Sequence, residues 1–292
     1  MQDSRVRTFL EVCRTMNYTR AAEALHITQP AVSQHIAFLE REYDAQLFRR
    51  DGKRLSLTPA GMMLRNALST MAHDETLLRE RVSALASGTR IELRIGMTLT
   101  AGEYIVAAPL AAYLAEHPEV RATVRSASTQ ELLEALDAGT LDCAFVEGYF
   151  DKEPYEWDTY CTERLVCVCA PGRMPRGQRS FEELLGMQLF IREKGSGTRE
   201  VLERALATRN LSLSSFADTC QIDSLDIIKV FVSEGLGISF MYEAAVEREI
   251  EEGALQVVSL QGAPIQHDIS FVRLRNSVFT SELSRLFAEL AL

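Results

Sequence analysis

The feature that most constrains the fold of this 292-residue chain is a change of periodicity near Gly88. Before it, apolar residues recur every three or four positions, which is the spacing of helices that bury one face. After it, short apolar runs typical of strands alternate with helical stretches, and this rhythm indicates an α/β domain with largely parallel strands. About 200 residues are many for one sheet, so we expect two lobes separated by a cleft.

The first forty residues carry three short helical patterns. Two of them, at about residues 5–16 and 19–25, precede a third that runs from Gln29 to about Glu42. Two short helices joined by a tight turn, the second bearing amide and hydroxyl side chains such as Ser33 and Gln34, form a helix-turn-helix. Side chains of this kind can hydrogen-bond base edges or phosphates, so the pattern predicts binding to duplex DNA.

A basic hairpin follows the third helix. Asp51-Gly52 lies between two short extended runs, which is the signature of a tight β-turn, and cations flank its tip. Such a wing lies well against a phosphate backbone. The candidate DNA-binding residues are Thr28, Gln29, Pro30, Ser33, Gln34, His35, Arg49, Arg50, Lys53 and Arg54.

The net charge of -10 does not exclude a nucleic-acid partner, because the acidity is unevenly distributed. Residues 1–88 contain 12 Lys and Arg and 10 Asp and Glu, a balance of +2, whereas residues 89–292 have a balance of -12. The basic wing can therefore meet the phosphates while the acidic part of the chain is held away from them.

A long amphipathic helix is predicted from about residue 58 to residue 86, with Thr58 as its cap and Pro59 at its first position. Its apolar positions alternate in steps of four and three, which is a heptad seam. The seam comprises Leu64, Leu68, Met71, Glu75, Leu78, Val82 and Leu85. We expect it to pair with a second copy of the chain, with Glu75 fixing the register. The alternative is a helix that packs on its own domain.

These patterns divide the chain into three parts. They are a winged helix-turn-helix domain at 1–57, a linker and dimerisation helix at 58–88, and an α/β domain at 89–292, with lobe I at about 89–162 and 268–292 and lobe II at about 163–267. In the α/β domain, strands are predicted at 91–96, 120–125, 143–147, 165–170, 188–191, 219–222, 237–241, 255–260 and 267–273. Helices are predicted at about 102–116, 130–138, 198–208, 224–234, 243–251 and 279–291.

The whole chain resembles the LysR-type transcriptional regulators. The segments that carry the resemblance are Ala21–Ser33, Leu47–Arg50 and Leu57–Gly61. The resemblance implies a homo-oligomer, commonly a homotetramer, that binds operator DNA. It further implies that the protein changes the bending of the DNA when a small effector enters the cleft of a periplasmic-binding-protein-like domain.

Within that family, the C-terminal part is similar to regulators of sulfur and cysteine metabolism. The matching segments are 98–104, 145–148, 192–200 and 235–239. Two departures stand out. The recognition helix has Gln34, His35 and Ala37 where relatives often have Arg or Gln, so the operator sequence does not follow from the resemblance. Pro109 falls inside the first helix of the α/β domain, where we expect a kink.

The candidate effector site is a set of hydroxyl side chains at the starts of four predicted helices. Helix N-termini carry partial positive charge and free N–H groups, and together they favour a bound anion or carboxylate. The hydroxyl residues are Thr98, Thr100, Ser128, Thr129, Ser196, Thr198 and Ser224. Each has the alternative role of a simple helix cap. Arg192 is expected to add a bidentate contact.

Glu147 fits less well into an anion site. It either pairs with Arg192 or binds a cationic amine on the effector. We therefore expect a small anionic metabolite, either an inorganic oxyanion or an amino-acid-like acid, and no cofactor.

Neither a secretory signal nor an apolar run of membrane-spanning length is present in the sequence, so a cytoplasmic location is expected. The six cysteines include no Cys-x-x-Cys pair and no zinc spacing, which favours free thiols and no metal site. Cys167 and Cys169 alternate with valines, which indicates one face of a strand and not a redox pair.

The sequence disfavours two function classes other than gene regulation. An α/β enzyme is disfavoured because Gly195-Ser196-Gly197-Thr198 lacks the Lys of a phosphate-binding loop and the five histidines are scattered. No GxSxG or GxGxxG motif follows a strand. A free small-molecule-binding protein would use only residues 90–292 and would leave residues 1–57 without a role.

Overall fold

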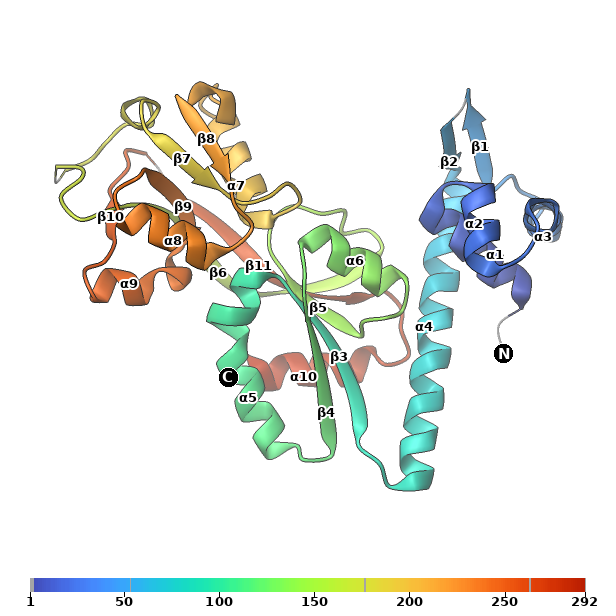
Figure 1. Cartoon of the computed structure of the whole chain (residues 1–292). Coiled ribbons are helices and arrows are strands. Elements are labelled where there is room, and N and C mark those ends of the chain that lie inside the picture. Colours follow the sequence, from blue (N-terminus) through green and yellow to red (C-terminus); the bar gives the residue numbers. More distant parts are fainter. Residues whose placement is uncertain (1–2, 53, 176, 263, 292) are drawn as a thin grey trace. The chain divides into compact units, whose positions relative to one another are not determined.

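The computed structural model describes residues 3–52, 54–175, 177–262 and 264–291, and the chain divides into two compact units (Figure 1). The first unit consists of the chain up to Ile91 together with two short segments from later in the sequence, Asp137–Thr140 and Leu274–Thr280. The second unit comprises the remainder. Its α/β organisation and the helical start of the first unit agree with the fold class that the sequence predicts.

The first unit begins with three short helices and an antiparallel hairpin. They are α1 (Ser4–Thr15), α2 (Tyr18–Leu25), α3 (Gln29–Glu42), β1 (Phe48–Asp51) and β2 (Arg54–Leu57). The Asn17 side chain accepts two backbone N–H bonds at the start of α2, and Thr28 Oγ1 accepts the Ala31 N–H at the start of α3. These caps explain why the chain breaks into separate helices here. Phe9 and Val32 are buried in the core that the three helices share.

Helix α4 (Pro59–Ser87) is the long helix predicted from the sequence, and it ends at Gly88 in the left-handed conformation. The first part of its seam is covered within the same chain, because Leu64 and Leu68 pack in the core of α1, α2 and α3. For these two residues the prediction of burial against a second chain is wrong, and the alternative of packing on the same domain holds.

The later part of the seam is uncovered. Met71, Leu78, Val82 and Leu85 are 65%, 55%, 58% and 86% exposed, respectively. An apolar stripe of this length facing solvent is unusual for a stable surface helix. This half of α4 therefore retains the features of an unpaired interface.

A different side of α4 packs on the two later segments of the first unit. Asp74 accepts hydrogen bonds from the Ser277 hydroxyl at 2.5 Å and from the Val278 N–H at 2.9 Å. Thr70 donates to the Arg275 carbonyl at 3.2 Å. His73 is buried beside Gly139.

The second unit is built on a mixed sheet whose described strands follow the order β4-β3-β5-β11-β6-β9-β7-β8, with β10 paired to β6. The strands are β3 (Ile91–Met97), β4 (Val120–Ser126), β5 (Cys143–Val146), β6 (Tyr155–Cys169), β7 (Gln188–Ile191), β8 (Asp218–Gln221), β9 (Ile238–Tyr242), β10 (Gln256–Val258) and β11 (Ile265–Leu274). The pairs β3–β5, β7–β8 and β7–β9 are parallel.

The expectation of a largely parallel sheet is wrong for the middle of this order, because β11–β5, β6–β9 and β10–β6 are antiparallel. Each of these pairs joins strands that lie far apart in the sequence, so the local pattern of apolar residues does not specify their relative direction. Strand β6 also begins ten residues before the predicted strand at 165–170.

Helices surround this sheet. They are η1 (Ala101–Val106), α5 (Ala107–Glu116), α6 (Thr129–Asp137), η2 (Glu182–Leu184), α7 (Gly197–Ala207), η3 (Leu213–Ser215), α8 (Leu225–Ser233), η4 (Glu243–Ala245), α9 (Glu247–Glu251) and α10 (Thr280–Leu290). The helix predicted at 102–116 begins as the π-helical segment η1 and continues as α5, which contains Pro109; the kink expected at Pro109 stays a prediction. The helix predicted at 243–251 is interrupted at Val246.

The buried side chains of the second unit form three clusters among the described residues. One contains Ile95, Phe145 and Phe271 from β3, β5 and β11. The other two lie on opposite faces of β6, where Cys167 and Cys169 point to one side and Val166 and Val168 to the other. This alternation confirms that the two cysteines share one face of a strand. Among the described helices, none is both long enough and apolar enough to cross a membrane.

Candidate DNA-binding surface and effector cleft

The start of α3 presents polar side chains to solvent. Gln29, Pro30 and Gln34 are exposed, and the Gln29 amide donates to Ser33 Oγ at 2.9 Å. The Thr28 hydroxyl is engaged as the helix cap, as its position in the sequence indicates. The amide and hydroxyl groups at this end of α3 can therefore reach a base edge without moving any core residue.

His35 lies on the same helix but is tied to α1. Its Nδ1 lies 2.8 Å from Thr8 Oγ1, and the Thr8 hydroxyl lies 2.9 Å from the Ser4 carbonyl oxygen, to which it donates. Because a hydroxyl has one proton, His35 Nδ1 must be the donor to Thr8. This contact escaped the sequence reasoning, since nothing in the pattern of α1 marks Thr8 as buried. A role for His35 in DNA contact stays a prediction, and it would have to use Nε2, because Nδ1 is bonded to Thr8.

The wing forms as the sequence predicts, with Asp51 opposite Arg54 across the turn. Arg49 and Arg50 are exposed; Arg49 Nε donates to Ser56 Oγ at 3.2 Å, and the Arg50 guanidinium lies 5.7 Å from the centre of the Tyr18 ring. Arg54 is also exposed. Lys53 lies outside the described residues. These contacts orient the arginines without neutralising them, which leaves their charge available to phosphates.

A cleft of about 520 Å³ lies in the second unit. One wall comes from the loop before α6 and from α6 itself, and the other comes from the loop that precedes α7. The lining residues are Leu99, Ser126, Ala127, Ser128, Gln130, Glu131, Glu134, Arg192, Glu193, Lys194, Gly195 and Asp223. Of the effector-site residues predicted from the sequence, Ser128 and Arg192 line this cleft.

Four of the predicted hydroxyls have partners within the chain. Ser128 forms a capping box with Glu131, and Ser224 Oγ accepts the Ile227 N–H at 3.4 Å. Thr129 Oγ1 donates to the Glu147 carbonyl at 2.6 Å, and Thr198 Oγ1 donates to Glu147 Oε1 at 2.8 Å. For these hydroxyls the simple structural role accounts for the observed contacts.

Other polar atoms in the same region are buried without a partner among the described residues. They are Thr98 Oγ1, Glu147 Oε2, Arg192 Nη1, Ser196 Oγ and Tyr242 Oη. Thr100 is also buried, and its side chain makes no capping hydrogen bond. Buried polar groups without partners are uncommon, and each costs free energy until a ligand or water satisfies it. Tyr242 gave no signal in the sequence, because a tyrosine in an apolar strand is typical of a core.

The expected ion pair between Glu147 and Arg192 does not form. Arg192 makes two bonds to its neighbour Glu193, from Nε to Oε2 at 2.8 Å and from Nη2 to Oε1 at 2.9 Å. Burial raises the pKa of Glu147 to about 6, against the opposing effects of the Thr198 hydrogen bond and the Arg192 charge. Glu147 is therefore a buried carboxyl whose Oε2 accepts no hydrogen bond from any residue within the described ranges.

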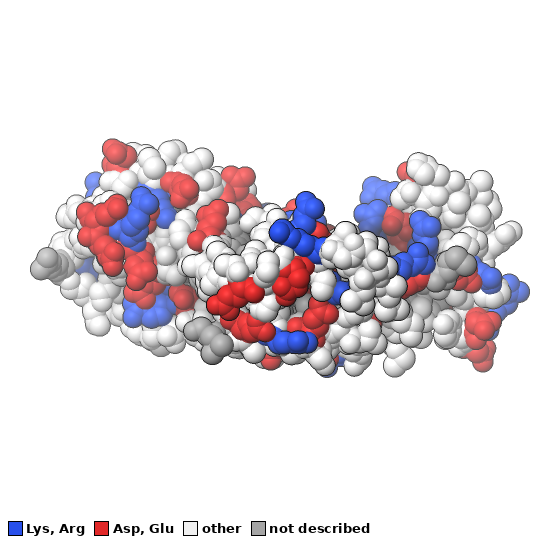
Figure 2. Space-filling model, turned by 90° about the horizontal axis from the view of Figure 1, so that it is seen from below, with Lys and Arg blue, Asp and Glu red and all other residues white. Residues whose placement is uncertain are grey.

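The charges around the cleft are mixed. Its lining carries four carboxylates, Glu131, Glu134, Glu193 and Asp223, and two cations, Arg192 and Lys194. Figure 2 shows that Asp and Glu also gather on one face of the second unit, which agrees with the negative balance of the C-terminal part of the sequence. An anion that enters this cleft therefore depends on local donors rather than on the general field.

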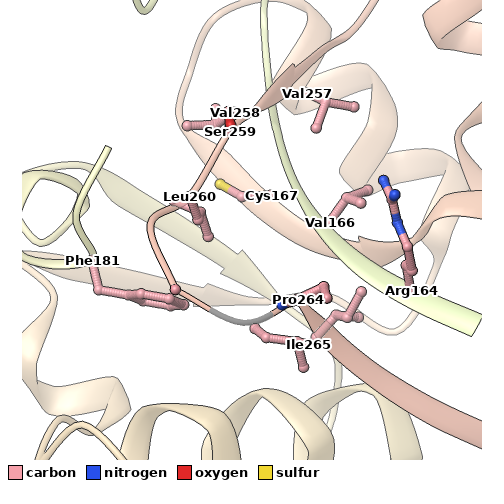
Figure 3. A pocket seen from close by; sticks show the side chains of 12 residues that line it. Arg164, Val166, Cys167, Phe181, Val257, Val258, Ser259, Leu260, Pro264 and Ile265 are labelled. Atoms are coloured by element: carbon pink, nitrogen blue, oxygen red, sulfur yellow. The ribbon is translucent and has the colours of Figure 1, made fainter. Parts of the chain in front are cut away.

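A second pocket, of about 260 Å³, lies beside β6 and β10 (Figure 3). Val166, Phe181 and Leu260 contribute apolar walls. Its charged lining residue, Arg164, already pairs with Glu243 at 2.8 Å. The cleft is the stronger candidate for a small polar ligand, because Arg192, whose Nη1 is buried, lines it, and Thr98 and Ser196 directly adjoin its lining residues Leu99 and Gly195. Within the described ranges, no group of three or more His, Cys, Asp or Glu side chains could hold a metal ion.

Comparison with known proteins finds a family model for each of two parts of the chain. A family model described as "Bacterial regulatory helix-turn-helix protein, lysR family" matches residues 4–62, and one described as "LysR substrate binding domain" matches residues 86–292. The transcriptional regulator CysL of Bacillus subtilis is 28% identical over 91% of this chain and 89% of its own length. The transcriptional activator CmpR of Synechocystis is 30% identical over 88% of this chain and 84% of its own length.

A solved structure has the same fold along the whole chain. Full-length LysG from Corynebacterium glutamicum, with bound effector Arg, covers all of this chain with 98% of its own, at a TM-score of 0.65 and 19% identity.

Proposed function

The chain belongs to the LysR family of bacterial transcriptional regulators, and from that premise we propose that it binds operator DNA and that a small effector in the cleft changes this binding. The observation that carries the effector half of the proposal is the group of buried polar atoms without partners near the cleft. Its relatives are regulators and not enzymes, and the site chemistry is that of binding.

For the DNA half, we assign base contacts to α3 and phosphate contacts to the wing. Ser33 and Gln34 reach base edges, and Thr28, Gln29, Pro30 and His35 complete the end of the helix that faces the groove. Arg49, Arg50, Lys53 and Arg54 contact phosphates. Such phosphate contacts supply affinity without sequence preference.

The exposed half of the α4 seam is assigned to a second copy of the chain. A dimer places two recognition helices on successive turns of DNA, and it covers Met71, Leu78, Val82 and Leu85. Two such dimers would make the homotetramer that is common in this family. In this arrangement residues 1–57 bind DNA, 58–88 dimerise, and 89–292 bind the effector, with lobe I at 89–162 and 268–292 and lobe II at 163–267. The site of action is the cytoplasm, where operator DNA is found.

The effector is assigned as a small metabolite with an acidic group. Arg192 Nη1, Ser196 Oγ and Thr98 Oγ1 are buried groups that can donate to an anion, and the buried Thr100 lies two residues after Thr98. Thr129, Thr198 and Ser224 hold the surrounding backbone through the contacts described above. The similarity to regulators of sulfur metabolism places sulfur oxyanions and O-acetylserine among the first compounds to test.

Calorimetry with the full-length protein tests the effector half. The panel is sulfate, sulfite, thiosulfate, O-acetylserine and simple dicarboxylates, with wild type, Arg192→Met and Thr100→Ala. We expect one acid to bind and Arg192→Met to weaken it by at least tenfold, because the variant loses a buried charged donor. Arg248→Met, an exposed arginine in α9, is the matched control and should bind as wild type. Equal binding by wild type and Arg192→Met would contradict the assignment.

A gel-shift assay tests the DNA half. The protein should retard the DNA upstream of its own gene, and the affinity should fall steeply as salt rises from 50 to 200 mM. An absence of retardation at low salt would contradict DNA binding.

A further inference from the structure

Glu147 is a buried group near the cleft that a purely anionic effector does not explain. It follows β5 directly and is buried, with 2% of its surface exposed. Its backbone carbonyl accepts the Thr129 hydroxyl, and its Oε1 accepts the Thr198 hydroxyl. Its Oε2 has no partner among the described residues. One oxygen of the carboxylate is therefore held, while the other is left to accept a donor from elsewhere.

The position of Glu147 is fixed by close packing. A Cβ at Gly197 would lie 2.5 Å from Glu147 Cγ and 2.6 Å from the Glu147 carbonyl carbon, so only glycine fits there. The carboxyl group cannot swing toward α7 to find a partner, because the backbone of that helix start occupies the space. A donor for Oε2 must therefore come to it.

The charged and titratable groups around Glu147 do not supply that donor. Arg192 acts on Glu147 electrostatically, but its Nε and Nη2 donate hydrogen bonds to Glu193. The Tyr242 hydroxyl, also buried without a partner, is influenced by the Glu147 charge but does not hydrogen-bond it. Burial raises the pKa of Glu147 only to about 6, so the carboxyl is mostly ionised near neutral pH. A buried carboxylate without a cation is costly, and a ligand cation would relieve that cost.

The rim of the cleft favours the same kind of ligand. With four carboxylates and two cations, it repels a compound that carries only negative charge and tolerates one whose charges balance. Glu147 and the donors Arg192 and Ser196 are linked through the 192–198 loop, whose Thr198 is bonded to Glu147. An acceptor for a cation and donors for an anion thus belong to one connected structure.

We infer that the effector is a small zwitterion whose ammonium group binds Glu147 Oε2 and whose acidic group binds Arg192 Nη1 and Ser196 Oγ. This inference rests on the proposed function, and it narrows the effector from acids in general to amino acids and aminosulfonic acids. The ligand would satisfy three buried polar atoms that otherwise have no partner.

Matched pairs of ligands that differ only in the amine test the inference. They are aspartate with succinate, taurine with ethanesulfonate, and O-acetylserine with 3-acetoxypropionate, each titrated calorimetrically into the full-length protein at pH 7.5. We expect one amine-bearing member to bind at least tenfold more tightly than its partner. Glu147→Gln should weaken that amine-bearing ligand by at least tenfold and change the affinity of the amine-free partner by less than about threefold. Gln can still accept the Thr198 hydroxyl bond, and Glu147→Asp, which keeps the charge, should retain the preference for the amine.

The outcomes separate this inference from the broader proposal. Tight binding of sulfate, sulfite or an amine-free acid, unaffected by Glu147→Gln but weakened by Arg192→Met, would overturn the zwitterion and leave the proposed function standing. Binding of none of these compounds would overturn both the zwitterion and the acidic effector of the proposed function, and would leave its DNA half to the gel-shift assay. A Glu147→Gln variant with unchanged affinity for the amine-bearing ligand would also refute the role of Glu147.

Discussion

The two polar regions of this molecule use opposite strategies. On α3 and the wing, the candidate groups are mostly exposed and already solvated, as Gln34, Arg50 and Arg54 illustrate. In the cleft region, the candidate groups are few and buried, and several have no partner in the part of the chain that the structure describes. Exposed charges contribute weakly one by one and are screened by salt. Buried groups without partners contribute strongly and individually, because nothing else satisfies them.

This contrast implies two kinds of behaviour in one chain. DNA binding should depend on the number of contacts, and therefore on dimerisation and on salt. Effector binding should depend on single residues and should be indifferent to dimerisation.

The largest effect is expected for Leu78→Asp in the exposed part of the α4 seam. A charge there should prevent pairing of the helices, so light scattering should report a loss of the dimer, and operator affinity should fall by at least a hundredfold. Effector binding should be unchanged. Met63→Asp is the control, because Met63 is 77% exposed on the same helix but lies off the seam. A Leu78→Asp protein that remained dimeric would refute the seam.

Gly197→Ala should destabilise the second unit by about 1–3 kcal/mol, because its Cβ would overlap Glu147. Urea unfolding of the full-length protein measures this, with effector calorimetry in parallel. Gly186→Ala is the matched control, since a Cβ at Gly186 meets nothing within 4 Å. Equal stability of the two variants would show that Glu147 is not held as tightly as its contacts indicate.

The pKa of Glu147 predicts a pH dependence of stability. Because the pKa in the folded state, about 6, is above the reference value of 4.5, the folded state favours the protonated carboxyl. That stabilisation is fully present below pH 4.5 and is lost as the pH rises through 6. Relative to Glu147→Gln, wild type should lose about 2 kcal/mol of unfolding free energy across this range. Urea unfolding of both proteins from pH 4.5 to 7.5 measures this. A constant difference in unfolding free energy between wild type and Glu147→Gln across this range would contradict the prediction.

The smallest effects separate base contacts from phosphate contacts. Gln34→Ala should cost about 1 kcal/mol on the operator and little on unrelated DNA, whereas Arg50→Ala should weaken both equally and lower the salt slope by about 1. Fluorescence anisotropy with the two DNAs over a range of salt measures this. If Arg50→Ala changed the base preference and left general affinity intact, the two assigned roles would have to be exchanged.

The regions also differ in how far the sequence predicts them. The helix-turn-helix and wing follow from local signals, namely the Thr28 cap, the Pro30 position and the Asp51-Gly52 turn. The contact between His35 and Thr8 did not follow, because it joins residues from two helices whose packing the sequence does not specify.

The cleft depended on long-range structure. The hydroxyl residues at the helix starts can be identified from the sequence. Which of these hydroxyls hydrogen-bond within the chain depends on partners such as the Glu147 carbonyl. Arg192 pairs with the adjacent Glu193 and not with Glu147, a choice that only three-dimensional placement decides. The antiparallel β6–β9 pairing was missed for the same reason, since strand direction depends on partners far apart in sequence.

The most direct test of the central claim is anisotropy of the full-length protein on its own upstream DNA and on a scrambled fragment of equal length, at fixed salt. We predict binding of the upstream fragment at least about a thousandfold tighter than binding of the scrambled one. Equal affinity for the two fragments would contradict the claim that this chain reads operator DNA.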